Sequence, residues 1–170
     1  MKRSGRTLKQ RLYGLKHITK YLSRARHFRG HGVHSPYVYN IVRKVFMRSE
    51  LYATDHSLYD ALIAIDTPRR RAIQLQNLVE HCAYQSWSID SLEQHPFIIA
   101  TTRVQPEELS RYNDYARECG ATLCIMAPYE CAERWRTASE IIEAHHSTTI
   151  DNRGYLLVFN NHLPKQKFRL

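Results

Sequence analysis

The sequence predicts an α/β protein whose sheet has about four to five strands, mostly parallel with a C-terminal antiparallel hairpin, preceded by an α-helical N-terminal region. Three observations predict this class. In the first half, apolar residues recur at spacings of three and four, the period of a helix with one buried face. In the second half, two continuous apolar runs, 97–101 and 122–126, alternate with helical patterns. Near the end, two β-rich runs flank an Asn-Arg-Gly turn.

The helical patterns come first along the chain. An apolar stripe from Leu8 to Ala25 predicts a helix over 7–28, followed by a loop. Ser35 is an N-cap residue type, and Pro36 suits the first helical position because its missing N–H is not needed there. Two further helices are expected over 55–65 and 68–85. We therefore expect residues 1–85 to form a basic helical N-terminal region.

Residues 86–170 are expected to form the α/β core, packed with the helical region into one compact domain. The expected strands and helices alternate: 87–90, 97–101, helix 106–119, 122–126, helix 129–144, 148–151 and 155–159. Gly120 follows the first of these helices as a C-terminal stop. Strand and helix alternating before a terminal hairpin predicts a mainly parallel sheet with an antiparallel edge.

Positive charge is concentrated at the N-terminus. Residues 1–48 carry thirteen Lys or Arg and no acid, whereas the rest carries all sixteen acids against twelve bases. The candidates for binding nucleic acid or an anionic surface are Lys9, Arg11, Lys16, Lys20, Arg24, Arg26 and Arg29. Such cations, interleaved with aromatic residues, can neutralise phosphates while the rings stack on bases. The pattern equally suits a membrane-surface helix, an acidic protein partner, or a helix packed on the domain with its cations in water.

Other functional classes find little support in the sequence. The four cysteines lack zinc-site spacing, so we expect reduced thiols and no metal site. No apolar run reaches the roughly 18 residues that a membrane span needs. Basic residues interrupt any signal-peptide core near the start. We therefore expect a cytoplasmic protein without a transmembrane segment.

Residues 31–39, HGVHSPYVY, resemble the N-terminal signature of a group of class I S-adenosylmethionine-dependent methyltransferases common in Bacteroidetes. The matching signature residues are His31, Gly32, His34, Ser35 and Pro36. Residues 73–79 resemble the helix that precedes the family's first strand, and 148–159 with 165–168 resemble its final hairpin. The resemblance implies a Rossmann-like methyltransferase sheet and S-adenosylmethionine as the cofactor.

The chain departs from this family at the cofactor site. The family's first strand ends in an acid, matched here by Asp90, followed by a glycine-rich turn that holds the cofactor. Residues 91–94 contain no glycine, and only six residues separate Asp90 from Phe97. A strand–helix crossover needs at least about 10 residues, so the family's next two units, which include the ribose-binding acid, do not fit there. The family's acids and histidines near the reacting end are replaced at 100–102 and 127–130.

These departures lead to an expected function. We expect a reduced Rossmann-like methyltransferase sheet in a degenerate, non-catalytic protein without catalytic residues or bound cofactor, acting as a partner or regulator. One alternative is a basic nucleic-acid-binding adaptor using residues 1–48; another is a methyltransferase active only when another subunit completes it. A shortened sheet leaves an edge or apolar face to cover, which predicts self-association or pairing with a related protein.

Overall fold

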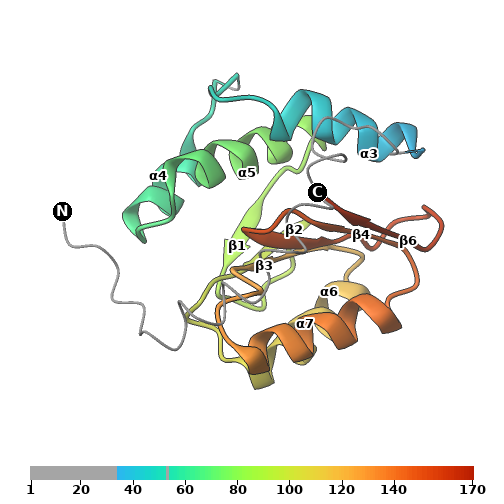
Figure 1. Ribbon diagram of the computed structural model, residues 1–170. Helices are drawn as coiled ribbons and strands as arrows, with labels where there is room; N and C mark the ends of the chain where they lie inside the picture. Colours follow the sequence, from blue (N-terminus) through green and yellow to red (C-terminus); the bar gives the residue numbers. More distant parts are fainter. Residues whose placement is uncertain (1–33, 53) are drawn as a thin grey trace.

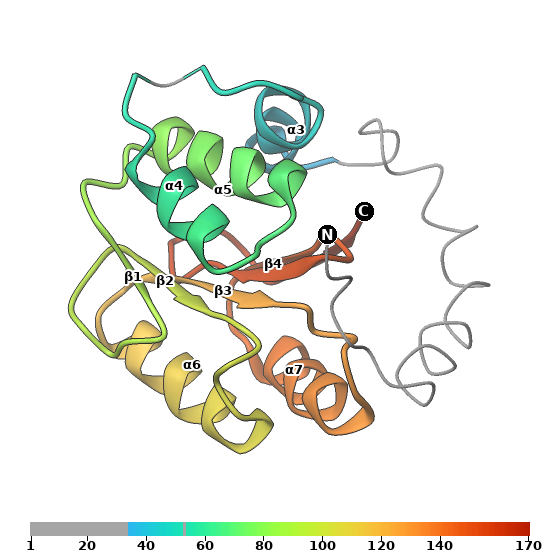
Figure 2. The same ribbon diagram turned by 90° about the vertical axis from the view of Figure 1, so that its left-hand side faces the viewer.

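A computed structural model of the chain describes residues 34–52 and 54–170. One six-stranded sheet lies between two helical layers (Figure 1). Helices α3 (Pro36–Ile41), α4 (Ser57–Ala64) and α5 (Arg69–His81) cover one face, and α6 (Leu109–Glu118) and α7 (Ala132–Ala144) cover the other (Figure 2). The predicted α/β class is confirmed. The helix expected over 7–28 lies outside the described residues.

The sheet is mixed, with only one strand running against the others. The strands are β1 (Trp87–Ile89), β2 (Phe97–Ala100), β3 (Thr122–Met126), β4 (Thr148–Asp151), β5 (Tyr155–Val158) and β6 (Gln166–Arg169). Their order is β1-β2-β3-β5-β4-β6, and β5 pairs antiparallel with both of its neighbours. The predicted β4–β5 hairpin is therefore confirmed, while β6, which pairs in parallel with β4, adds a strand that the sequence analysis did not expect.

Burial on both faces explains the continuous apolar runs. In β2, Phe97 and Ile99 point into the cluster beneath α3–α5, whereas Ile98 and Ala100 point into the cluster above α6 and α7. None of these four side chains is exposed. A strand covered on both faces gains burial from every residue, so its sequence does not alternate. The two helical layers therefore hold β2 and β3 at the centre of the hydrophobic core.

The connection between β1 and β2 is short for two parallel neighbours. Residues 90–96 form neither helix nor strand, although β1 and β2 are parallel and in direct register. Leu92 of this connection packs against the α6–α7 cluster. β1 is the terminal strand, and its outer edge pairs with no strand among residues 34–52 and 54–170.

Several element boundaries differ from the expected ones for local reasons. The strand expected over 87–90 ends at Ile89, because Asp90 has a φ of 54°. α5 ends before residue 85, and Ala83 just beyond it has a φ of 53°. α7 begins later than residue 129, because Cys131 caps it: its Sγ accepts the amide N–H of Arg134 at 3.4 Å. After α3 the chain continues through a π-helical turn, η1 (Val42–Phe46), and α6 is preceded by a 3-10 turn, η2 (Pro106–Glu108).

Candidate functional site

The ends of the parallel strands bring several polar residues to one edge of the sheet. We call this edge, formed by Asp90, Thr101, Ala127 and Asp151 at the ends of β1 to β4, the carboxyl edge. In open α/β sheets, ligands bind in the crevice outside the carboxyl ends of the strands. The carboxyl edge is therefore the place to test for a cofactor site.

Both carboxylate oxygens of Asp90, the candidate cofactor ligand, accept hydrogen bonds from Thr101 at the end of the neighbouring strand. Its Oδ1 accepts the amide N–H of Thr101 at 2.6 Å, and its Oδ2 accepts the Thr101 hydroxyl, also at 2.6 Å. The backbone N–H of Asp90 donates to the carbonyl of Ile99 at 2.8 Å. These three bonds make Asp90 the link that ties the end of β1 to the end of β2.

Arg134 is buried beside this link. It projects from the first turn of α7 and is 2% exposed, the largest fully buried side chain among the described residues. Its guanidinium donates to four backbone carbonyl oxygens: Ala100 at 3.4 Å, Thr101 at 2.8 Å, Val104 at 2.7 Å and Met126 at 3.1 Å. Because Ala100 and Met126 end β2 and β3, one side chain joins both strand ends to the loop between them.

The positive charge of the buried Arg134 guanidinium is compensated by carbonyl dipoles and not by an ion pair. Burial lowers the pKa of Arg134, and the nearby groups of Glu130, Cys131 and Asp90 raise it in turn. All Asp and Glu residues of the chain belong to the described residues, and none of their carboxylates lies within ion-pair distance of the Arg134 guanidinium. Arginine stays protonated in proteins, so its hydrogen bonds to carbonyl dipoles must offset the cost of burying the charge.

This arrangement does not fit a nucleoside sulfonium cofactor. A cofactor of that type needs a close backbone turn after β1, and residues 90–96 contain no glycine to form one. The carboxylate of Asp90 is already bonded to Thr101, and the cationic fork of Arg134 lies against the ends of β2 and β3. A positively charged sulfonium would also be repelled by that guanidinium.

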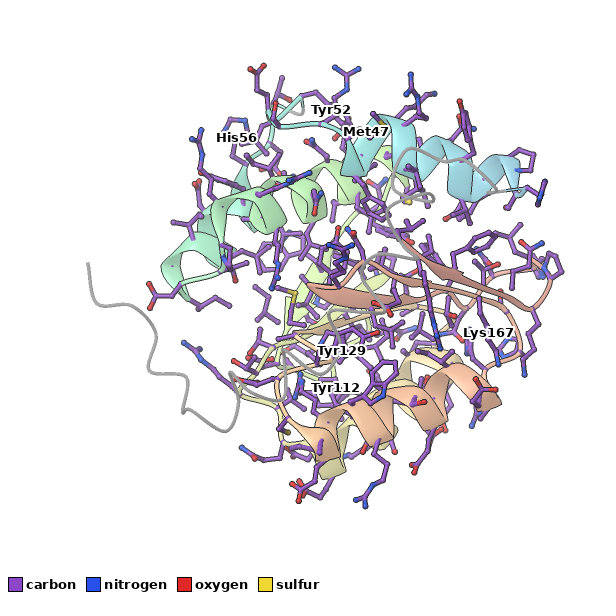
Figure 3. The ribbon with its side chains drawn as sticks, in the orientation of Figure 1. Met47, Tyr52, His56, Tyr112, Tyr129 and Lys167 are labelled. Atoms are coloured by element: carbon purple, nitrogen blue, oxygen red, sulfur yellow. The ribbon has the colours of Figure 1, made fainter. Side chains whose placement is uncertain are left out.

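The far half of the carboxyl edge carries a second polar pair, Tyr129 and Asp151. Tyr129, which follows β3, donates its hydroxyl to Oδ2 of Asp151 at the end of β4. The Tyr129 ring stacks on Trp135 of α7 with centroids 4.4 Å apart, and Figure 3 places Tyr129 on the α7 side of the sheet. Oδ1 of Asp151 accepts the amide N–H of Arg153 at 3.0 Å. Side chains of the chain itself therefore bridge this half as well.

The signature residues that the structure describes have a structural role. Ser35 caps α3, its hydroxyl accepting the amide N–H of Val38 at 3.4 Å, and Pro36 is the first helical residue as predicted. Tyr37 then packs edge-on against Phe159, with centroids 5.6 Å apart. His34 is exposed, and His31 and Gly32 lie outside the described residues.

The seven basic candidates, Lys9, Arg11, Lys16, Lys20, Arg24, Arg26 and Arg29, also lie outside the described residues. Within 34–52 and 54–170, no group of three His, Cys, Asp or Glu residues is arranged to hold a metal ion. No helix in that part of the chain is long and apolar enough to cross a membrane.

Two features escaped the sequence analysis. Arg134 lies on the same helical face as Ala138, Ile141 and Ile142, which are buried, so its position on an apolar stripe was a usable signal. The second is a surface pocket lined by Arg48, Arg69 and Arg70, which residues distant in sequence form only after folding.

Comparisons with models of known protein families, with curated proteins and with solved structures find no match to this chain.

The account of Arg134 predicts a large loss of stability when it is replaced. Arg134→Met keeps an unbranched stem but is shorter and has no N–H, so four carbonyl oxygens lose the donor that Arg134 supplies. We expect the free energy of unfolding, measured by urea titration, to fall by about 3 kcal/mol or more. Arg136→Met, on an exposed position of the same helix, should change it by less than about 0.5 kcal/mol. Equal effects of the two substitutions would contradict the account.

Proposed function

We propose that this chain is a methyltransferase-like protein that does not catalyse methyl transfer and acts as the partner or regulator of another protein. The observation that carries the proposal is that Asp90 and Arg134 are both hydrogen-bonded to strand ends at the carboxyl edge. Methyl transfer requires the donor held in line with the nucleophile, often with a base positioned nearby. Here Asp90 and Arg134, the groups nearest to the expected donor position, form hydrogen bonds that hold the strand ends together.

The partner role is supported by the end of the sheet. The outer edge of β1 pairs with no strand among the described residues, and unpaired edges are sites where another chain can add a strand. Trp87 and Ile89 of β1 are only half-buried, so apolar surface accompanies this edge. A second copy of the chain or a related protein of the same architecture would cover it.

Titration calorimetry with S-adenosylmethionine tests the loss of the cofactor. We expect no binding in the micromolar range by the full chain, and the same result for Asp90→Asn, because neither form has a cradle for the donor. Micromolar binding by the unmodified chain that Asp90→Asn weakens would contradict the proposal. It would show that Asp90 leaves Thr101 to bind the donor.

Self-association is tested separately by light scattering on the purified chain. We expect a mass above that of the 20.1 kDa chain, reduced to that of the monomer by Ile89→Lys, which places a charge on terminal strand β1. Because Ile89 also packs against the core beneath α3–α5, thermal unfolding must show that this variant keeps its fold. An exposed lysine elsewhere, introduced as Ile63→Lys on α4, should leave the mass unchanged. A monodisperse monomer at all concentrations would contradict self-association and favour a related protein as the partner.

A second candidate function is nucleic-acid binding through residues 1–48. It is supported by Arg43, Lys44 and Arg48, which lie in the described part of that segment and are all exposed. Arg43 and Lys44 belong to η1, so a folded element presents them to solvent. Together with the residues before position 34, they give the segment thirteen bases and no acid.

Binding of a single-stranded oligonucleotide, followed by fluorescence anisotropy, tests this candidate. We expect the affinity to fall steeply as salt is raised, because bound cations release counterions from the phosphates. Removal of residues 1–28 should abolish it. Binding that the truncation leaves unchanged would exclude the N-terminal segment as the binding element.

A further inference from the structure

A pocket of about 480 Å³ lies between the end of η1 and the first turn of α5. It is lined by Met47, Arg48, Ser49, Arg69, Arg70 and Ile73. In Figure 3, Met47 lies on the α3–α5 side of the molecule, away from Tyr112 and Tyr129 on the opposite side of the sheet. The pocket is open to solvent along one side, so a ligand bound there would stay partly exposed.

Two buried amide side chains of α5 hold the pocket wall in place. Gln74 donates its Nε2 to the carbonyl of Phe46 at 2.8 Å, immediately before Met47. Asn77 donates its Nδ2 to the carbonyl of Glu50 at 2.9 Å, and its Oδ1 accepts the amide N–H of Tyr52 at 3.3 Å. Gln74 is 5% exposed and Asn77 is fully buried. The segment that carries Arg48 is therefore anchored on both sides before any ligand binds.

The pocket is positively charged, which favours an anionic ligand. Three of its six lining residues are arginines and none is an acid. The side chains of Arg48 and Arg69 form no hydrogen bond or ion pair within the described residues. Arg48 and Arg69 place two like charges at the same pocket, so an anion bound between them would stabilise this arrangement. The first turn of α5 adds to this field, since it has no acidic residue and no side-chain cap.

The remaining lining residues indicate what the anion is attached to. The planar guanidinium fork matches the oxygens of a phosphate in bidentate fashion. Beside the arginines, Met47 is 38% exposed and Ile73 contributes an apolar wall. A thioether and an aliphatic side chain can pack against the face of a flat ring. The Met47 Sδ also accepts a hydrogen bond from Nη1 of Arg43 at 3.6 Å, which helps to fix its position. The pocket therefore combines a phosphate-binding half with an apolar half.

We propose that this pocket binds a nucleotide, with the phosphate held by Arg48 and Arg69 and the base against Met47. The phosphate can belong to a free nucleotide or to a nucleic-acid strand, and the test separates the two. This proposal does not depend on whether the chain has lost methyl transfer. It places a phosphate site in the folded domain rather than in the N-terminal segment.

The test uses the full chain and two pairs of substitutions of equal charge. Arg48→Gln with Arg69→Gln removes the phosphate ligands, and Arg103→Gln with Arg136→Gln removes two exposed arginines outside the pocket. Each form is titrated with adenosine 5′-monophosphate, with adenosine, and with a single-stranded oligonucleotide. Thermal unfolding of both variants checks that the fold is kept.

We expect the pocket pair to weaken binding of the nucleotide, the oligonucleotide or both by about tenfold or more, and the control pair to change it less than about twofold. Adenosine should bind about tenfold more weakly than its monophosphate. Binding only to the free nucleotide, or only to the strand, identifies the source of the phosphate.

Equal weakening by both pairs, or absence of binding to both phosphate ligands, would overturn the proposal. Oligonucleotide binding that survives in the pocket pair but is lost without residues 1–28, with no nucleotide binding that the pocket pair weakens, would also overturn it. That last result would leave the N-terminal nucleic-acid function intact, so the failures of the two ideas are distinguishable.

Discussion

The buried guanidinium of Arg134 is the interaction on which the carboxyl half of the sheet depends. It donates to the ends of β2 and β3 and to the loop between them, where four carbonyl oxygens converge on one side chain. A charge taken out of water is costly unless its hydrogen-bonding groups are satisfied, and here carbonyl dipoles supply that satisfaction. The position of α7 against the sheet follows, because the same residue lies in its first turn.

The short β1–β2 connection works together with this interaction. Seven residues link two parallel neighbours, a length that leaves no room for a crossover helix. Asp90 leaves the strand at a φ of 54° and ties its carboxylate to Thr101, so β1 ends against β2 instead of opening onto a cleft. In open α/β sheets, ligands usually bind at the carboxyl ends of the strands. Here Asp90 and Arg134 are hydrogen-bonded to the strand ends at that position.

The sequence was a good guide wherever burial alone determined the structure. β2 and β3 are continuous apolar runs, and the helix begun by Ser35 and Pro36 follows from their local chemistry. β6 was missed because its exposed Lys167 and Arg169 alternate with half-buried residues, a weak pattern for four residues at an edge. The start of α7 was misplaced because a thiol, rather than a hydroxyl or carboxylate, caps it.

The candidate site was less predictable, for a physical reason. Asp90 was identified from its place after a strand, but its bond to Thr101 depends on how the two strand ends meet. Arg134 was not singled out, since burial of arginine is rare and here depends on carbonyls from distant segments. The arginine pocket likewise joins residues 47–49 to 69–73, which are brought together by Gln74 and Asn77. Contacts between distant segments leave little trace in local sequence patterns.

A crystal structure of the chain grown with saturating S-adenosylmethionine would show whether the carboxyl edge binds the donor or only its own strand ends. The account predicts electron density for the Arg134 fork on the carbonyls of Ala100, Thr101, Val104 and Met126, with Asp90 bonded to Thr101 and no donor at the carboxyl edge. Donor density beside Asp90, with the Arg134 side chain displaced from those carbonyls, would contradict it.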